Sequence, residues 1–440
     1  MAQLDKKLNL WGLTMIAVGA CIGSGIFASP GQIVQSVPHH GLVVLVWMIG
    51  GVIALTGALT FAELGAMFPK AGGVYVFLKE AYGDYMGFLY GWVILLIINT
   101  GALAALAIIF ADYMTFFIPL SQTGKIILAI CTIMGLTLLN ITGVNTSQWM
   151  ANVFTGAKLL ALLVIILLGF YFYQPTELSL DFSFGTLPEG AGHGLLLGLI
   201  GVLWAMGGWH HASYLASETI KAKRTVPRAM VFGVLIVMIM YILTNIAYMM
   251  ILPLDEIAAT DKVAGVAMAA LHPAGGRIMA IVIAISVFGT IAIYTMSAPR
   301  IYYAMAEDGL FFKQLKAIHP RFKTPANAML AQAIWAIILL LLMQTFTNLI
   351  TYVTFMDIIF MTLAGAAVFI LRQRMPDLPR PVKTLGYPLP PIIFILISTA
   401  FVISTFDGRP QQAWAGLTVL AIGLPVFFIF RGMRNSGSSR

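Results

Sequence analysis

The sequence predicts an all-α membrane protein with twelve transmembrane helices, and three observations lead to this fold class. Hydrophobic residues make up 60% of the 440 residues and charged residues only 10%, whereas a soluble domain is roughly 25% charged. From Leu8 to Ala62 the chain has no Asp, Glu, Lys or Arg, although about 20 apolar residues already span a bilayer as a helix. Similar apolar stretches recur along the chain, separated mostly by short polar loops.

We expect one membrane-spanning helix in each apolar stretch. In chain order, the predicted spans are 9–34, 41–67, 84–111, 125–142, 149–172, 192–216, 228–252, 274–304, 326–344, 348–371, 389–406 and 413–431. We expect no cleavable signal peptide, because the first apolar stretch is long and lacks a convincing cleavage site.

The distribution of Lys and Arg predicts the orientation in the membrane. With the N-terminus inside, only Lys125, Lys262, Arg277 and Arg409 fall on the outer side, and Lys158 falls within a span. All other Lys and Arg residues are then cytoplasmic, as the positive-inside rule requires. The chain is therefore predicted to lie in the cell (plasma or inner) membrane with both termini in the cytoplasm. The same rule accounts for the net charge of +8 without a nucleic-acid partner.

Two predicted spans are interrupted by glycines near their middle. The first contains "CIGSGIFASPG" (residues 21–31), and the sixth contains "WAMGGWHHASY" (residues 204–214). A glycine inside a helix costs about 1 kcal/mol relative to alanine, so a purely structural helix gains nothing from it. Glycine-interrupted spans at corresponding positions of two halves are typical of transporters built from inverted repeats. We expect a first repeat at 1–172, a second at 173–371, and two peripheral helices with the C-terminal tail at 372–440.

Backbone groups freed at these interruptions predict a binding site. Inside a membrane, unpaired backbone groups are tolerated only where they line a cavity or bind a ligand. N–H groups at Gly23, Ser24 and Gly25 would begin a half-helix, which suits a carboxylate. Free carbonyls at Ile22 and at Ala205 and Met206 would suit an ammonium group. A site that offers both within a few ångströms describes an α-amino acid.

Several motifs resemble one family of transporters. "GSGIF" in the first span, "GGVYVFLKEAYG" (72–83), "GGW" in the sixth span, "SETIKAKRTVPRAM" (217–230) and "PRIYYAMAEDGLFF" (299–312) are similar to signatures of the amino acid–polyamine–organocation superfamily. "TGAKLL" in the fifth span is most similar to its L-type branch, which includes alanine-serine-cysteine exchangers. The resemblance covers the first ten spans in order. It implies a 5+5 inverted-repeat fold with broken helices 1 and 6, alternating access, and sodium-independent exchange of neutral L-amino acids.

The resemblance also implies roles for particular residues. Substrate-binding residues would be Ile22, Gly23, Ser24, Gly25, Ile26, Trp204, Ala205, Met206 and Gly207. Trp204 would be an aromatic gate, and its bulk favours small substrates such as Ala, Ser, Cys, Thr or Gly. The sequence departs from the family at His210 and His211, where a polar residue, often Asn or Asp, is usual. The loop between the third and fourth spans has no Cys, so we expect no disulfide-linked heavy chain.

Lys158 is the most informative polar residue within a span. It follows Trp149 by nine residues, which places it about 13 Å into the fifth span at 1.5 Å per residue, too deep for ordinary snorkelling. We expect its ammonium to bond carbonyls of the broken first span and the hydroxyl of Ser286. A fixed charge there would make sodium coupling unnecessary. Alternatively, Lys158 carries a proton, which would make the chain a proton-coupled symporter.

Other intramembrane polar residues leave alternatives open. Asp357 is a partner of Lys158, a separate gate, or a solvated residue near the outer end of its span. An interfacial role is favoured for Glu63, and packing or a vestibule contact for His210 and His211.

Other function classes lack their sequence signals. No phosphate-binding loop, metal-ligand spacing or paired catalytic groups occur, so we expect neither a metal, a cofactor nor an enzyme. A channel would need a continuous polar lining. Export of larger neutral amino acids stays open as an alternative.

Overall fold

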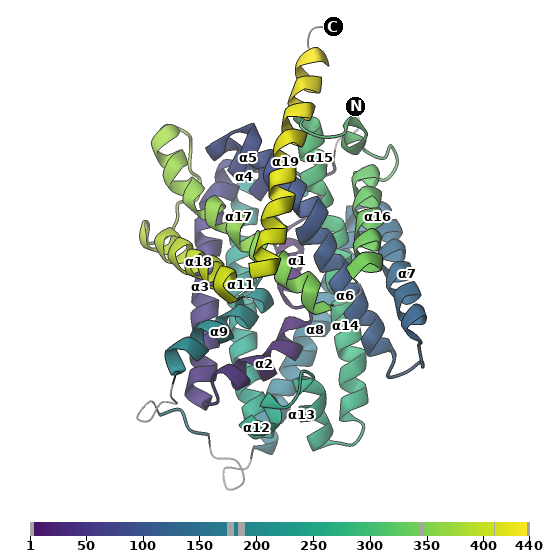
Figure 1. Ribbon diagram of the computed structural model, residues 1–440, viewed down its shortest axis with the longest axis vertical. Helices are drawn as coiled ribbons and strands as arrows, with labels where there is room; N and C mark the ends of the chain where they lie inside the picture. Colours follow the sequence, from purple (N-terminus) through teal and green to yellow (C-terminus); the bar gives the residue numbers. More distant parts are fainter. Residues whose placement is uncertain (1–3, 174–179, 184–189, 344–345, 409, 438–440) are drawn as a thin grey trace.

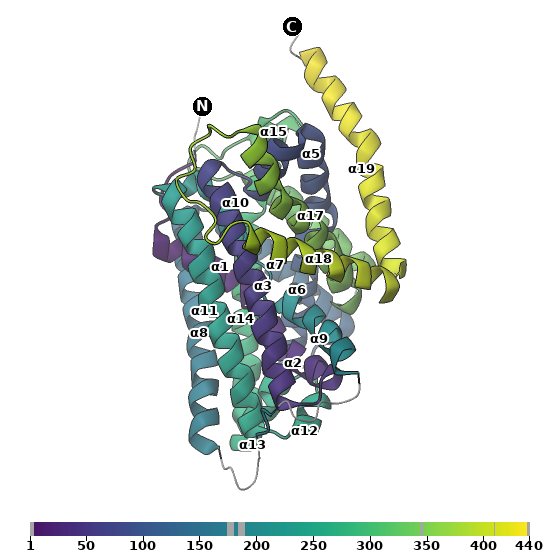
Figure 2. The ribbon, with the colours of Figure 1, turned by 90° about the vertical axis from the view of Figure 1, so that its left-hand side faces the viewer.

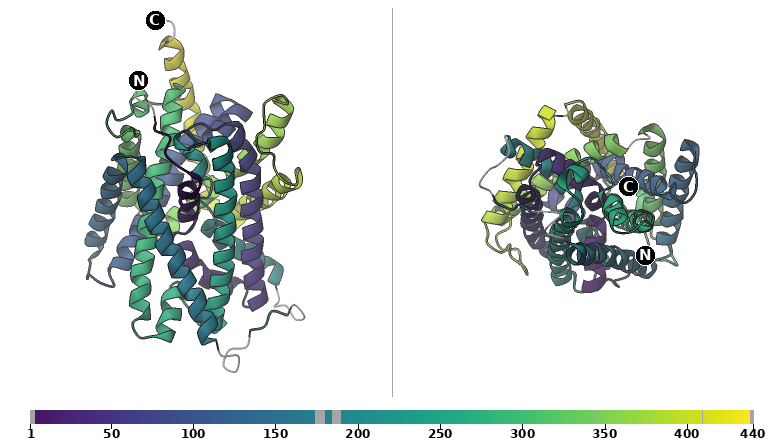
Figure 3. Two further views of the ribbon diagram at one scale, coloured as in Figure 1. Left: turned by 180° about the vertical axis from the view of Figure 1, so that it is seen from behind. Right: turned by 90° about the horizontal axis from the view of Figure 1, so that it is seen from below.

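The computed structural model describes residues 4–173, 180–183, 190–343, 346–408 and 410–437. The chain forms a bundle of helices, and both termini lie at the same end of it (Figures 1 and 3). Nine helices of the described part are long and apolar enough to cross a membrane, and one bent pair forms a tenth span. Two shorter apolar helices, Ala191–Ala205 and Ala326–Leu342, correspond to the remaining two predicted spans. The predicted all-helical fold is confirmed.

The first five spans comprise eight α-helices and one π-helical turn. They are α1 (Leu10–Cys21), α2 (Gly25–Ser36), α3 (His40–Met67), α4 (Val74–Tyr82), α5 (Asp84–Val93), the π-turn η1 (Ile94–Ile98), α6 (Asn99–Met114), α7 (Gln122–Ile141) and α8 (Val144–Phe172).

The rest of the chain follows a similar order and then adds two helices. Its elements are α9 (Ala191–Ala205), α10 (His211–Tyr214), η2 (Ala216–Glu218), α11 (Ala222–Ile251), α12 (Leu254–Ala258), α13 (Val263–Leu271), α14 (Gly275–Ser297), α15 (Pro299–Glu307), η3 (Lys313–Lys316), α16 (Ala326–Met343), α17 (Phe346–Arg374), α18 (Leu389–Gly408) and α19 (Pro410–Gly437). Figure 2 shows α19 on the outside of the bundle and α18 lying across it.

Both glycine-containing spans are broken where the sequence predicts. The helices α1 and α2 are bent by 42° across Ile22–Ser24. Five residues, 206–210, separate the end of α9 at Ala205 from the start of α10 at His211. The two breaks lie against each other. A Cβ on Gly208 would lie 2.7 Å from the carbonyl oxygen of Ala20, and Gly208 has φ +103°. Only glycine fits this close approach without strain.

Glu218 joins three parts of the chain at the end of the bundle where the termini lie. Its carboxylate forms a fully buried ion pair with Arg300 of α15, with N–O distances of 2.8 to 3.0 Å. Its backbone carbonyl accepts from the N–H groups of Lys7 and Leu8, both at 2.9 Å. The segment before α1 is thereby fixed to the end of the sixth span, and that span to the eighth.

This geometry predicts that Arg300→Met will lower the free energy of unfolding by about 3–5 kcal/mol, because it leaves the Glu218 carboxylate buried and unpaired. Thermal unfolding of the purified protein in detergent measures the effect. Lys125→Met is the matched control, since Lys125 pairs with Asp112 on the exposed surface, where an ion pair contributes roughly 0.2–1 kcal/mol. Adding Glu218→Leu to Arg300→Met should restore part of the loss. Equal melting temperatures for Arg300→Met and Lys125→Met would contradict the assignment.

Candidate functional site

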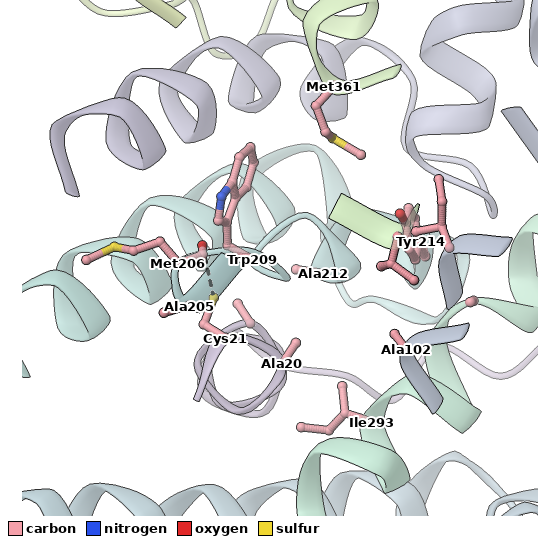
Figure 4. Packing of buried hydrophobic residues seen from close by; sticks show 14 of the residues in the cluster. Ala20, Cys21, Ala102, Ala205, Met206, Trp209, Ala212, Tyr214, Ile293 and Met361 are labelled. Carbon is pink, nitrogen blue, oxygen red and sulfur yellow. Dashed lines mark hydrogen bonds between the residues drawn. The ribbon is translucent and has the colours of Figure 1, made fainter. Parts of the chain in front are cut away.

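A cavity of about 90 Å³ lies where the two breaks meet. Its walls come from both breaks, from η1 and α6, from α14, and from α17 and α18. Figure 4 shows Cys21 at the end of α1 close to Met206, with Trp209 beside Met206 and Met361, which belongs to α17, beyond Trp209. The helix α18, predicted to be peripheral, contributes Phe394 and Ser398 to the lining.

Seven of the nine predicted substrate residues line this cavity. They are Gly23, Ser24, Gly25, Trp204, Ala205, Met206 and Gly207. Ile22 and Ile26 are fully buried and are not among the lining residues. The Ser24 hydroxyl is buried and has no hydrogen-bond partner in the described part of the chain, so the wall contains a polar group that a ligand can satisfy.

Opposite helix dipoles meet at the breaks. The helix α2 begins at Gly25, and the first N–H groups of a helix have no partner inside it, which favours an anion there. The helices α1 and α9 both end at the breaks, at Cys21 and Ala205, so their carbonyl ends favour a cation. This arrangement can hold the carboxylate and the ammonium of one small zwitterion.

A tyrosine hydroxyl links the two carbonyl ends. The Tyr241 hydroxyl lies 3.0 Å from the carbonyl of Cys21 and 3.2 Å from that of Ala205. It has one proton to donate, so at any moment one of these carbonyls lacks it. The Cys21 thiol also contacts the Met206 carbonyl, at 3.9 Å. The carbonyls of Ala205 and Met206 thus retain capacity for a further donor.

Lys158 is not among the residues that line the cavity, and its ammonium is fully bonded to α1, the first break and α14. Its ammonium donates to the carbonyls of Gly19 (2.9 Å) and Ile22 (2.7 Å) and to the Thr290 hydroxyl (2.7 Å). Three N–H donors therefore meet three acceptors, and the side chain is 1% exposed. The charge sits at the carbonyl end of α1, where the helix dipole favours a cation.

The hydroxyl bonded to Lys158 corrects one expectation. We expected Ser286, but the partner is Thr290, one helical turn further along α14. Ser286 instead lies 3.4 Å from the Ile22 carbonyl and 3.3 Å from the Gly23 carbonyl. Since the Ile22 carbonyl also accepts from Lys158, we no longer assign the substrate ammonium to it in this conformation.

Asp357 lines the cavity and is not paired with Lys158. It belongs to α17, and within the described ranges its buried Oδ1 atom has no hydrogen-bond partner. The acceptors of Lys158 all lie on α1 and α14, so the expected alternative of a Lys158–Asp357 pair is wrong. Our predicted substrate residues did not include Asp357; the available signal was a lone acidic residue in an apolar span.

The two histidines that depart from the family also line the cavity. Nδ1 of His211 lies 2.6 Å from the Ser297 hydroxyl, and its ring packs 4.3 Å from the ring of Tyr294, centroid to centroid. Beside them, the hydroxyls of Tyr90 and Tyr214 hydrogen-bond each other at 2.6 Å. This side of the cavity is therefore built from polar side chains, whereas the breaks offer backbone groups.

Glu63 lies away from the cavity, at an interface. It accepts from Arg372 at 2.6 and 2.9 Å and from the Thr384 N–H at 2.8 Å, and Arg380 lies 3.3 Å away. It thus fixes α3 to the end of α17 and the segment that follows. Within the described ranges, no three His, Cys, Asp or Glu residues gather into a group that could hold a metal ion.

Comparisons with known proteins agree with this geometry. The family model described as amino acid permease matches residues 8–428. The mouse large neutral amino acids transporter small subunit 2 is 32% identical over 97% of this chain and 81% of its own length. The mouse Asc-type amino acid transporter 1 is 30% identical over 97% of this chain and 81% of its length. The serine/threonine exchanger SteT of Bacillus subtilis is 30% identical over 99% of this chain and 98% of its length.

Two glycines at the first break allow a paired prediction. A Cβ on Gly25 would lie 2.7 Å from Cβ and 2.8 Å from Cα of Ala205, whereas a Cβ on Gly23 would make ordinary contacts of 3.7 Å. Gly25→Ala should therefore force α2 away from α9, cost about 1–3 kcal/mol of stability, and weaken amino acid binding. Gly23→Ala should keep the melting temperature of the unaltered protein. Calorimetric binding of alanine and thermal unfolding in detergent test both; a fully stable Gly25→Ala protein would contradict the close packing.

Proposed function

Because this chain belongs to the amino acid permease family, we propose that it is a sodium-independent exchanger of small neutral L-amino acids. The substrates would be Ala, Ser, Cys, Thr and Gly, moved across the membrane by alternating access. The observation that carries the proposal is the cavity at two broken spans, where the start of one half-helix and the ends of two others converge.

The substrate would bind mainly through backbone groups. In this proposal, N–H groups at Ser24, Gly25 and Ile26 hold the carboxylate, with the Ser24 hydroxyl beside them. The Gly23 N–H already donates to the Cys21 carbonyl at 2.9 Å, so Gly23 contributes to the wall of the site but supplies no donor. Carbonyls at Ala205, Met206 and Gly207 hold the ammonium. Trp204 lines the same cavity and would act as the gate over a small side chain. The chain would perform no chemical reaction on its substrate.

The bonding of Lys158 supports exchange over ion-coupled uptake. Its ammonium occupies the space between α1, α8 and α14 that a bound cation would otherwise fill, and all three hydrogens have acceptors. A fixed charge cannot be released with the substrate. The empty carrier would then lack an ion whose binding favours its return, so a second amino acid would speed that return.

The membrane context belongs to the same proposal. The two repeats, 1–172 and 173–371, would move relative to each other in a cell membrane, with both termini in the cytoplasm. We also propose that no heavy chain is attached by a disulfide. Cys21 is buried and Cys131 lies within the span α7, so neither is in the loop between the third and fourth spans.

Counterflow in proteoliposomes tests the exchange mechanism. Vesicles loaded with alanine should take up labelled alanine much faster than empty vesicles, and equally in sodium and choline buffers. An imposed pH gradient should drive little accumulation into empty vesicles. Strong proton-driven uptake into empty vesicles would contradict exchange and would favour the symporter, and a preference for leucine or phenylalanine would favour a carrier of larger amino acids.

Lys158→Met should slow counterflow roughly 10- to 100-fold, because even one hydrogen bond from a charged group contributes about 1.5–3 kcal/mol. Thr155→Val is the matched control on the same helix. Its hydroxyl donates to the Met15 carbonyl at 3.0 Å, so it removes a neutral contact between α8 and α1 while leaving Lys158 in place. Equal rates for the two variants would show that the ammonium has no special role.

A further inference from the structure

One wall of the cavity presents an acidic side chain that forms no ion pair with the described residues. Asp357 lies on α17, and Val353 and Met361, one turn away on either side, also line the cavity. The Oδ1 atom of Asp357 is buried and has no hydrogen-bond partner among the residues that the structure describes. No Lys or Arg is among the residues that line the cavity.

Oδ1 of Asp357 receives no hydrogen bond from the described residues around it. Tyr214 and Tyr294 line the same cavity. The Tyr214 hydroxyl hydrogen-bonds that of Tyr90 at 2.6 Å. The cavity is lined by apolar residues such as Ile98, Leu106 and Phe394 and by polar residues such as Asn99, His211 and Ser398.

A buried carboxylate in such surroundings needs a hydrogen-bond donor. Leaving it unpaired when the cavity closes is costly, whereas a donor from the ligand would remove that cost. The backbone groups at the breaks suit the ammonium and carboxylate common to all α-amino acids. The remaining part of an amino acid, its side chain, is therefore the part available to Asp357.

We propose that Asp357 selects amino acids whose short side chain ends in a hydrogen-bond donor, so that a hydroxyl is preferred to a methyl group of the same size. This inference rests on the proposed function and adds a selectivity determinant to the same cavity. An apolar side chain of equal volume fits the space but leaves Oδ1 without a donor. A site built to bond a substrate hydroxyl rejects the analogue that lacks it more strongly than an apolar pocket rejects an added hydroxyl.

Two pairs of competitors of nearly equal size test the proposal in alanine-loaded proteoliposomes. Inhibition of labelled alanine exchange is measured for threonine against valine, and for serine against 2-aminobutyrate. The hydroxyl member of each pair should inhibit at a roughly 10- to 100-fold lower concentration, the range expected of a hydrogen bond to a charged group. The ratio of inhibitory concentrations is measured on the unaltered protein, so it tests the preference for a hydroxyl even if altered proteins fail to fold.

Asp357→Asn assigns the selectivity to the carboxylate. The amide keeps the shape and one acceptor oxygen but loses the charge, so both ratios should fall by about fivefold or more. Asp112→Asn makes the same chemical change at an exposed site paired with Lys125, and should leave both ratios unchanged.

Different results would contradict the role of Asp357 and the proposed function. Alanine exchange with equal inhibition by threonine and valine would overturn this inference and leave the proposed function standing. Equal slowing of every substrate by Asp357→Asn, together with loss of a pH dependence, would make Asp357 a proton site and would also overturn it. Absence of any amino acid exchange by the unaltered protein would overturn both.

Discussion

The arrangement of the core depends on one interaction, the ammonium of Lys158 bound between the carbonyls of Gly19 and Ile22. A helix that stops in the middle of a membrane leaves carbonyls without hydrogen-bond donors, because water cannot reach them. A lysine ammonium at that depth likewise lacks water as an acceptor for its N–H groups. Hydrogen bonds between the Lys158 ammonium and these carbonyls satisfy both groups. The break in the first span is therefore stable without a ligand, and the opposite side of that break is free to line a cavity.

The two breaks form a single site because glycines allow their backbones to pack closely. Gly25 lies against Ala205 and Gly208 against Ala20, so each broken span contacts the other on both sides of the cavity. A Cβ at either glycine would separate the half-helices. Tyr241 bridges the carbonyl ends on α1 and α9. Half-helix dipoles then act over short distances, where they affect a bound zwitterion most strongly.

Sequence patterns predicted the parts of this structure that depend on local composition. Hydropathy located the spans to within a few residues, as in 84–111 against Asp84–Met114, and the glycine pairs located both breaks. The sequence did not predict which residues of distant segments are in contact. Ser286 and Thr290 lie one turn apart on the same face of α14, so periodicity could not decide which one meets Lys158. No sequence pattern indicated that the backbone of Leu8 would pair with Glu218.

Lys158 and Asp357 differ in whether the protein itself satisfies their hydrogen-bonding groups. Every N–H of Lys158 has an acceptor within the protein, so its charge stabilises the break and is not free to travel with a substrate. Oδ1 of Asp357 has no such partner among the described residues, so it remains available to a ligand that enters the cavity. Under the proposed function, obligatory exchange follows from the first condition and side-chain selectivity from the second. Coupling and specificity would therefore depend on different residues, Lys158 on α8 and Asp357 on α17.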